Sequence, residues 1–507
     1  MHRQDPLILQ HGPFTVYVKP LAGCPALQPL LHSLPLKMPV MWCDSARQHP
    51  ATGRWSLLGY DPWLTLIARG QEVEVRTSAA THLIRSNPLD ALRQILRRYR
   101  APASVETQAK AIGLMGFLSY DVNRWIERLP APQPALQSIP EMVWCGMKVV
   151  VLVDHLQQRS WVFSVVDPHA PQPFARREAC EALEQAIASL GVSSVHEPHR
   201  CSTDAGGAAP RDSLNEEASG NRVVLEATST PAAFASMVSR ALDYIRAGDI
   251  FQANVSQRFT TPWSGSARDL YDRLRRINPS PFACFLSWED LSVVSCSPER
   301  LVRVQEGCVE TRPIAGTRPR GATPQDDAMN SLELLLSEKE RAEHIMLVDL
   351  ARNDVGRVCD AGSVGVNEFM TLEEYSHVIH IVSNVKGQMR RGMDAVDIIR
   401  AVFPGGTITG CPKVRCMQIL RELEPVARGL YTGSLGYLGF DGTMDLNIAI
   451  RTMVIQGQQL SFHVGAGIVA DSLPEREYHE TLAKAQALIQ ALQGSGERFR
   501  DLHAASR

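Results

Sequence analysis

The chain has 507 residues, of which 44% are hydrophobic and 21% are charged. This length predicts more than one domain, and the composition is that of a globular protein that buries a large core. The formal net charge of -2 gives no sign of a nucleic-acid or membrane partner. None of the 11 cysteines forms a Cys-x-x-Cys pair, which favours a reduced, cytoplasmic protein over a disulfide framework or a zinc site.

The chain divides into two unequal blocks of predicted structure. Residues 1–192 form the first block, and residues 193–222, rich in Ser, Gly, Ala, Pro and charge, are predicted to be a flexible linker. Residues 223–495 form the second block, which holds nearly all the motif-like residues, and residues 496–507 are predicted to be a C-terminal tail.

Apolar spacing predicts the main elements of both blocks. In the first block, the strands Lys148–Val153 and Ser160–Val166 are predicted to form a hairpin. In the second block, helical spacing predicts the helices Ala232–Ala247, Lys413–Leu423 and Glu475–Leu492. Apolar runs predict the strands Leu446–Ile455 and Gln459–Val464.

Two pairs of glutamates have a spacing that suits a metal site. Glu340 and Glu343 are three residues apart, as are Glu477 and Glu480, so each pair lies on one face of a helix. If the two faces converge, they offer the oxygen ligands that Mg²⁺ prefers. The ordinary alternative is a solvated acidic helix face.

Other polar residues lie in apolar or glycine-rich surroundings. The loop 403–413 and the segment 465–469 offer backbone N–H groups to an anion, although each also suits a plain turn. Arg451 interrupts an apolar strand pattern and needs either an anionic ligand or a structural ion pair. His380 lies in Ile-His-Ile-Val, where a satisfied core histidine is more common than a catalyst.

The motifs of the second block resemble the chorismate-utilising enzymes, which include anthranilate synthase component I and aminodeoxychorismate synthase component I. The resemblance spans nearly the whole block, in order, through the stretches 247–259, 297–300, 313–317, 347–357, 375–380, 403–413, 448–452 and 467–472. The first block resembles the family more loosely, through Asp44-Ser45 and Arg54-Trp55-Ser56.

The resemblance implies a fold and a set of site residues. The expected fold is an α/β (α+β) sandwich of mainly antiparallel sheets flanked by helices, with the active site in the central cleft. Glu299 matches an acid that protonates the leaving C4 hydroxyl, and His380 matches a histidine beside the reacting ring. The four glutamates match the Mg²⁺ ligands of the family. The positions that match substrate-contacting residues are Gly316, Thr407, Tyr431, Arg451, Gly467 and Lys484, and Thr317 ends the Pro-Ile-Ala-Gly-Thr motif.

Gln252 and Ala315 bear on the nucleophile and on the branch of the family. Relatives that use water carry a lysine base where this chain has Gln252, so ammonia is the expected nucleophile. Ala315 excludes the covalent lysine of many aminodeoxychorismate synthases and is usual in anthranilate synthases. Three other features favour the aminodeoxychorismate branch: Asn254, the sequence of residues 405–409 and the sequence of residues 432–437. A subclass of that branch also carries alanine at the position of Ala315.

The expected activity is therefore that of aminodeoxychorismate synthase component I, with anthranilate synthase component I as the alternative. Ammonia is expected from a separate glutamine amidotransferase subunit, because no Gly-x-Cys-x-Gly nucleophile turn with a following His/Glu pair is evident. Cys43-Asp44-Ser45 stands where tryptophan-inhibited anthranilate synthases carry Leu-Glu-Ser. A water-using isochorismate or salicylate synthase and a non-catalytic chorismate-binding protein remain as hypotheses of other classes.

Overall fold

A computed structural model describes most of the chain, namely residues 6–48, 52–102, 111–168, 172–191, 224–321, 323–374 and 378–493. The predicted linker (193–222) and C-terminal tail (496–507) lie outside the described residues.

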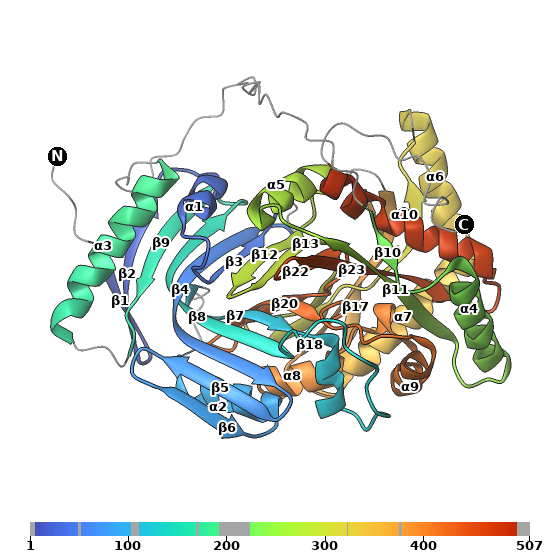
Figure 1. The fold of residues 1–507 in the computed structure, drawn as a ribbon, viewed down its shortest axis with the longest axis horizontal. Helices are drawn as coiled ribbons and strands as arrows, with labels where there is room; N and C mark the ends of the chain where they lie inside the picture. The colour runs from blue at the N-terminus through green and yellow to red at the C-terminus, as the bar shows by residue number, and fades with distance from the viewer. Residues whose placement is uncertain are drawn as a thin grey trace.

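The described residues form a large, mainly antiparallel sheet system with helices on its outside (Figure 1). This confirms the fold class expected from the sequence. The described residues of the first block form the strands β1 (Leu7–His11), β2 (Phe14–Leu21), β3 (Val40–Asp44), β4 (Trp55–Arg69), β5 (Glu72–Thr77), β6 (Thr81–Arg85), β7 (Gly113–Leu118), β8 (Met142–Asp154) and β9 (Arg159–Val165).

Strand β8 shows how composition sets the architecture. Its residues are apolar on both faces and nearly all buried, as expected of a central strand that is covered on both sides. It pairs with β4, β7 and β9. The predicted hairpin is confirmed as β8–β9, although β8 begins earlier than the predicted strand.

The second block continues the same sheet system with strands β10 to β23. These are β10 (Glu226–Ala227), β11 (Gln252–Pro262), β12 (Phe282–Trp288), β13 (Leu291–Ser297), β14 (Arg300–Gln305), β15 (Cys308–Thr311), β16 (Ile314–Pro319), β17 (Gly365–Glu374), β18 (Val378–Gln388), β19 (Gly410–Cys411), β20 (Ser434–Gly439), β21 (Met444–Asn447), β22 (Thr452–Gln456) and β23 (Gln459–Ile468).

The helices lie on the outside of the sheets (Figure 1). They are α1 (Gln28–Ser33), α2 (Pro88–Arg98), α3 (Gln172–Leu190), α4 (Pro231–Arg246), α5 (Ala267–Ile277), α6 (Pro324–Leu336), α7 (Glu338–Gly356), α8 (Ala395–Val402), α9 (Lys413–Leu423) and α10 (Pro474–Gln493), with 3₁₀ turns η2 (Tyr120–Trp125) and η3 (Gly406–Ile408). The three helices predicted from the sequence are confirmed as α4, α9 and α10. Thr230 caps α4 and Ser337 caps α7, each through its side-chain oxygen.

The predicted strand Leu446–Ile455 is wrong as a single element. The structure divides it into β21, which pairs with β14 and β20, and β22, which pairs with β13 and β23. The chain changes partners across residues 448–451, where Ile448 N donates to Glu299 O (3.0 Å) and Arg451 has φ +50. This break places Arg451 at the end of a loop rather than within a ladder.

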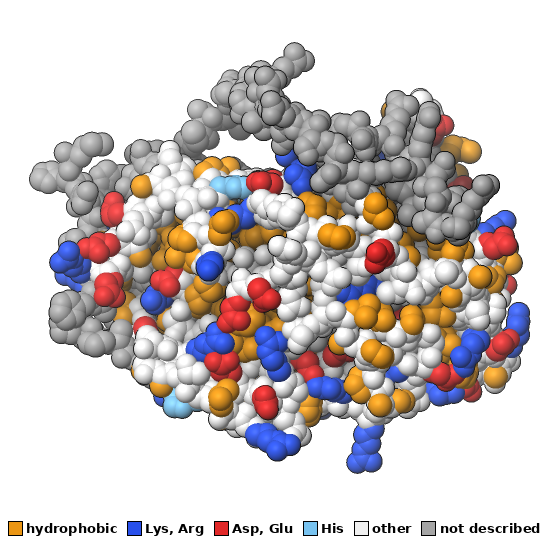
Figure 2. Space-filling view, in the orientation of Figure 1, with side chains coloured by type: hydrophobic (Ala, Val, Ile, Leu, Met, Phe, Trp, Pro, Cys, Tyr) orange, Lys and Arg blue, Asp and Glu red, His pale blue; other side chains and the backbone are white. Residues whose placement is uncertain are grey.

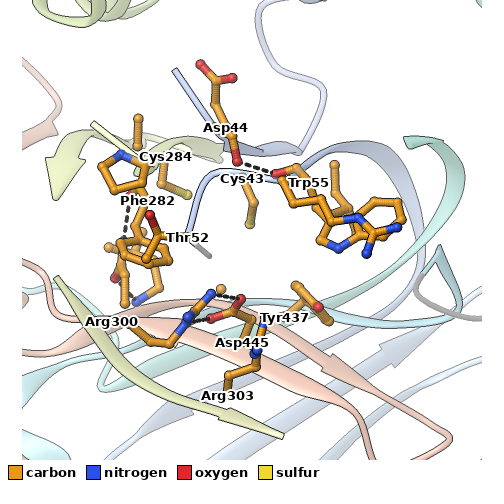
Figure 3. A pocket seen from close by; sticks show the side chains of 18 residues that line it. Cys43, Asp44, Thr52, Trp55, Phe282, Cys284, Arg300, Arg303, Tyr437 and Asp445 are labelled. Carbon is orange, nitrogen blue, oxygen red and sulfur yellow. Dashed lines mark hydrogen bonds and ion pairs between the residues drawn. The ribbon is translucent and has the colours of Figure 1, made fainter. Parts of the chain in front are cut away.

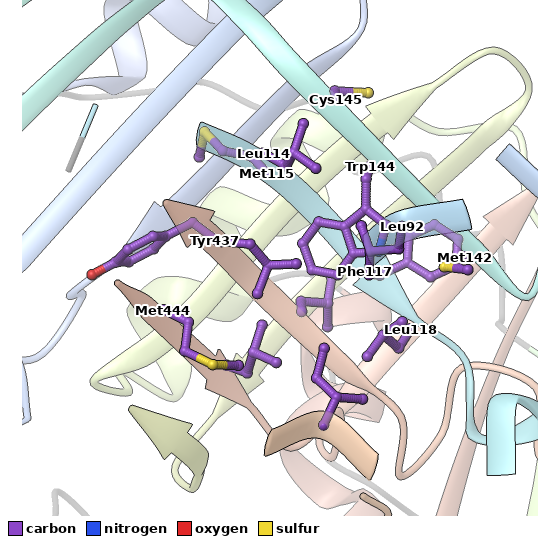
Figure 4. Close-up of a cluster of buried hydrophobic side chains, with 14 of the residues drawn as sticks. Leu92, Leu114, Met115, Phe117, Leu118, Met142, Trp144, Cys145, Tyr437 and Met444 are labelled. Atoms are coloured by element: carbon purple, nitrogen blue, oxygen red, sulfur yellow. The ribbon is translucent and has the colours of Figure 1, made fainter. Parts of the chain in front are cut away.

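The two blocks share one sheet and its two largest apolar clusters. Strand β3 pairs with β12, and β7 pairs with β20. In the largest apolar cluster, Phe117 and Trp144 from the first block lie near Tyr437 and Met444 from the second (Figure 4). The site-bearing strands are therefore held partly by residues of the first block.

The surface matches the balanced charge of the chain. Figure 2 shows basic and acidic side chains interspersed over the face in view. Within the described ranges, no helix combines the length and the apolar character needed to cross a bilayer.

Candidate active site

Glu299 is a buried carboxyl group between β13 and β14. Its side chain accepts a hydrogen bond from Thr407 Oγ1 (2.8 Å), which η3 presents, and the residue is 5% exposed. Burial raises its pKa to about 7, against the opposing effects of Thr407 and the Ile314 backbone N–H. Both residues line a cavity of about 30 Å³ with Gly405 and Gly406. Glu299 is thus able to carry a donatable proton near neutral pH.

His380 lies on β18 opposite β16, the strand that carries the Pro-Ile-Ala-Gly-Thr motif. The backbone of Thr317 pairs with His380, and Ala315 pairs with Ile381. His380 Nδ1 lies 3.2 Å from Gly316 O, and since a carbonyl only accepts, Nδ1 carries the proton. Burial, together with the positive charges of Arg451 and Lys484, lowers the pKa of His380 to about 4. His380 is therefore neutral at pH 7, close to two cations.

Gln252 links β11 to helix α7. Its Nε2 donates to Glu343 Oε1 (2.6 Å). A Cβ at Gly467, on the neighbouring strand β23, would lie 2.8 Å from the same Nε2, so only glycine fits there without a shift. The amide is held between the carboxylate of α7 and the backbone of β23.

Tyr431 and Lys484 meet at Gly465, on the same strand as Gly467. Lys484 Nζ donates to Gly465 O (3.0 Å), and a Cβ at Gly465 would lie 2.7 Å from the Tyr431 hydroxyl. Burial raises the pKa of Tyr431, so its hydroxyl stays protonated and able to donate. Arg451 Nη1 donates to Asn278 Oδ1 (3.4 Å).

The four predicted metal-binding glutamates come from α7 and α10. Burial raises the pKa of Glu343, and the negative charges of Glu340 and Glu480 raise it further. Burial and Glu480 likewise raise the pKa of Glu477, whose Oε2 is buried without a hydrogen-bond partner among the described residues. The carboxylates of the two helices are therefore close enough for their charges to act on one another.

These carboxylates are not gathered into a ligand set. Glu340 pairs with Arg318 (3.2 Å) and Glu480 with Lys484 (2.8 Å). In the part of the chain that the structure describes, no three His, Cys, Asp or Glu side chains lie close enough to hold a metal ion. The site nevertheless suits a hard divalent cation, because its donors are carboxylate oxygens that repel one another and because Glu477 Oε2 has no partner among the described residues. Arg318 is absent from the predicted site residues, since an arginine in a strand pattern gives no signal of its own.

Asp44, at the edge of a second cavity of about 60 Å³, has its carboxylate fully occupied. Tyr271 Oη donates to it (3.1 Å), Ser56 Oγ donates to it (3.2 Å) and Arg275 forms an ion pair with it. On the opposite wall of this cavity, Arg300 binds Asp445 through two parallel hydrogen bonds of 2.9 and 3.0 Å (Figure 3).

Comparison with known proteins gives a family for this chain. The model of a family described as chorismate binding enzyme matches residues 40–490. Anthranilate synthase component 1 of Synechocystis sp. is 39% identical over 466 residues, covering 89% of this chain and 90% of that protein. Aminodeoxychorismate synthase component 1 of Bacillus subtilis is also 39% identical, over 445 residues, with 88% and 90% covered.

Solved structures share the fold. Anthranilate synthase component I from Streptococcus pneumoniae superposes with a TM-score of 0.74 at 32% identity, covering 88% of this chain and 93% of that chain. The menaquinone-specific isochorismate synthase from Escherichia coli has a TM-score of 0.69 at 16% identity, covering 97% and 96% of the two chains, and supports the fold alone.

Proposed function

This chain belongs to the chorismate binding enzyme family and is a chorismate-utilising enzyme, and from that premise we propose that it is component I of an aminodeoxychorismate synthase. It would convert chorismate and ammonia to 4-amino-4-deoxychorismate, the precursor of p-aminobenzoate. The observation that carries the choice of ammonia is Gln252: a neutral amide bound to Glu343 occupies the position where water-using relatives carry a lysine base.

The residues of the site suit an amination at the chorismate ring. Arg451, Tyr431 and Lys484 would hold the substrate carboxylates, with the open backbone of Gly467 against the ring. Glu299 would protonate the C4 hydroxyl so that it leaves as water. Ala315 carries no amine, so ammonia itself would add at C2 as the C4 hydroxyl leaves. A second ammonia would then add at C4 as the C2 amino group leaves as ammonia, without a covalent link to the protein.

Mg²⁺ is the proposed cofactor. Glu340, Glu343, Glu477 and Glu480 would hold it, which requires Arg318 and Lys484 to release their carboxylates. When bound, the ion would neutralise the ring carboxylate of the substrate and act as a Lewis acid.

The surroundings of Asp44 support the folate branch. Arg275, Tyr271 and Ser56 occupy the carboxylate that would otherwise meet an amino-acid ammonium.

Anthranilate synthase component I remains the second candidate, and Ala315 is the observation that favours it. Relatives of both names are 39% identical to this chain, so identity does not separate them. In both cases a separate glutamine amidotransferase subunit would supply ammonia. If the product is aminodeoxychorismate, another enzyme must remove pyruvate.

Product identity separates the two candidates. The purified chain is incubated with chorismate, Mg²⁺ and ammonium at high pH, and the products are identified by mass spectrometry before and after an aminodeoxychorismate lyase is added. We expect p-aminobenzoate only after the lyase. Anthranilate and pyruvate without the lyase would assign the chain to tryptophan synthesis, and no turnover would leave a chorismate-binding role.

A further inference from the structure

A third cavity, of about 180 Å³, shares Tyr431 with the proposed active site but none of the other residues assigned to chemistry above. Its walls come from β11, β22, β23, the segment 427–431 and the segment 132–141 of the first block. Tyr431 lies at the boundary between this cavity and the proposed active site. Its ring stacks on His463, which lines the cavity, with 5.2 Å between centroids and 10° between planes. Its hydroxyl lies toward Gly465.

Arg258 lines this cavity with a buried guanidinium that has no ionic partner among the residues that the structure describes. The residue is 3% exposed, and neither its Nε nor its Nη2 has a hydrogen-bond partner in the described ranges. Burial alone lowers its pKa to about 10, with no carboxylate acting to raise it. Burying an unpaired cation costs free energy unless an anion or hydrogen-bond acceptors pair with it.

The unpartnered edge of Arg258 is the one that this chain uses elsewhere for carboxylates. Arg300 binds Asp445 through Nε and Nη2, at 2.9 and 3.0 Å, and Arg54 binds Asp154 through the same two atoms, at 3.0 and 2.7 Å. This edge matches the two oxygens of a carboxylate. In Arg258 no carboxylate of the described residues occupies this edge, and the residue lines a cavity instead.

His463 supplies a second unsatisfied group at the same place. It lies directly opposite Arg258 in the β11–β23 ladder and is 6% exposed, and its Nδ1 has no partner among the described residues. Burial keeps the pKa of His463 far below its usual range, with Arg258 and Arg428 adding to the effect. A neutral imidazole can donate one hydrogen bond to an anion.

We propose that this cavity binds a small organic monocarboxylate, with its carboxylate on the Nε–Nη2 edge of Arg258 beside His463. A single charge is indicated because the other two arginines of the lining are already paired, Arg124 with Glu141 and Arg428 with Glu424, which leaves Arg258 as the cation for the ligand. A short apolar chain on the ligand is indicated because Leu136, Ile139 and Phe462 also line it. The site does not depend on which product the enzyme makes.

Butyrate is the probe for this site, with chloride at equal ionic strength as the control anion. Binding to the full chain is measured by calorimetry and by the thermal midpoint of unfolding. We expect butyrate to bind and raise the midpoint, and chloride to do neither. Arg258→Met should weaken butyrate affinity by about tenfold or more, since a hydrogen bond to a charged group contributes at least that factor. No butyrate binding by the unaltered chain overturns the proposal, as does equal affinity in Arg258→Met.

Arg451→Met is the matched control, because Arg451 belongs to the proposed active site. It should keep its affinity for butyrate. Affinity lost in Arg451→Met but kept in Arg258→Met would place the carboxylate in the active site and overturn the proposal. If Arg258→Met does not fold, crystals of the unaltered chain grown with butyrate decide: density on Arg258 supports the site, and density absent there overturns it.

Discussion

Glu299 must be protonated to act as the proposed proton donor, so its pKa sets the pH range in which the enzyme is active. Its pKa of about 7 means that the acid form predominates below pH 7 and is lost as the pH rises through that value. At a fixed concentration of free ammonia, we therefore expect kcat/KM for chorismate to fall above pH 7. Glu299→Gln should lower the rate by about 10²- to 10⁴-fold and remove this descending limb. A limb that persists in Glu299→Gln would assign the titration to another group.

Thr407 offers a way to move this limb without removing the acid. Its hydroxyl stabilises the Glu299 carboxylate, so Thr407→Val should raise the pKa of Glu299 and shift the descending limb to higher pH. Thr409→Val is the control, because Thr409 Oγ1 donates to Gly405 O (2.8 Å) and not to Glu299. A shift toward lower pH in Thr407→Val would contradict the assigned role of this hydrogen bond.

Ala315 tests where the substrate ring lies. It is 8% exposed on β16, next to the backbone that faces His380. Ala315→Lys should lower kcat about tenfold or more by crowding the ring. A lysine this close to C2 should also form a covalent adduct with it. Turnover and intact-protein mass after exposure to chorismate measure both effects. Unchanged turnover together with unchanged mass would remove Ala315 from the neighbourhood of C2.

At the scale of elements, α7 and α10 carry the carboxylates whose charges raise one another's pKa. Glu480→Gln removes one of these charges, so in the absence of Mg²⁺ it should leave the free energy of unfolding unchanged or slightly higher. Saturating Mg²⁺ at about 100 times Kd should stabilise the unaltered chain by about 2.7 kcal/mol. We expect Glu480→Gln to lose most of this gain and most of its turnover.

Glu475→Gln is the matched control for the metal prediction. Glu475 lies in the first turn of α10, but it is exposed and outside the proposed ligand set. It should keep both the Mg²⁺-induced stabilisation and the turnover of the unaltered chain. Thermal unfolding with and without Mg²⁺ measures the first effect. A normal Mg²⁺ response in Glu480→Gln would remove Glu480 from the metal site.

Periodicity predicts single elements well and changes of strand partner poorly. Helices α9 and α10 follow from local spacing alone, because each buries one apolar stripe. The break between β21 and β22 does not, because Ile448 and Ile450 continue the apolar pattern while the backbone turns toward Glu299. The pairing of Glu340 with Arg318 and the unpaired edge of Arg258 are likewise results of packing between distant segments, which no spacing rule reports.

At the scale of the whole molecule, the sequence division into two blocks does not describe how the core is built. The linker composition marks a boundary along the chain. The pairings β3–β12 and β7–β20 cross that boundary, and Phe117 and Trp144 are fully buried in a cluster shared with the second block. Which strands of the first block meet which strands of the second depends on contacts far apart in sequence. The motifs of one block therefore do not reveal them.

This shared core predicts that residues 223–495 do not fold alone. Without the first block, β12 loses β3, β20 loses β7, and the cluster loses side chains such as Phe117 and Trp144. Removing one such aromatic side chain costs about 3–5 kcal/mol, and a whole domain is stable by about 5–15 kcal/mol. The fragment should therefore lack a cooperative thermal transition, and co-expression with residues 1–192 should restore it. A fragment that unfolds cooperatively at the midpoint of the full chain would show that the crossing pairings add little.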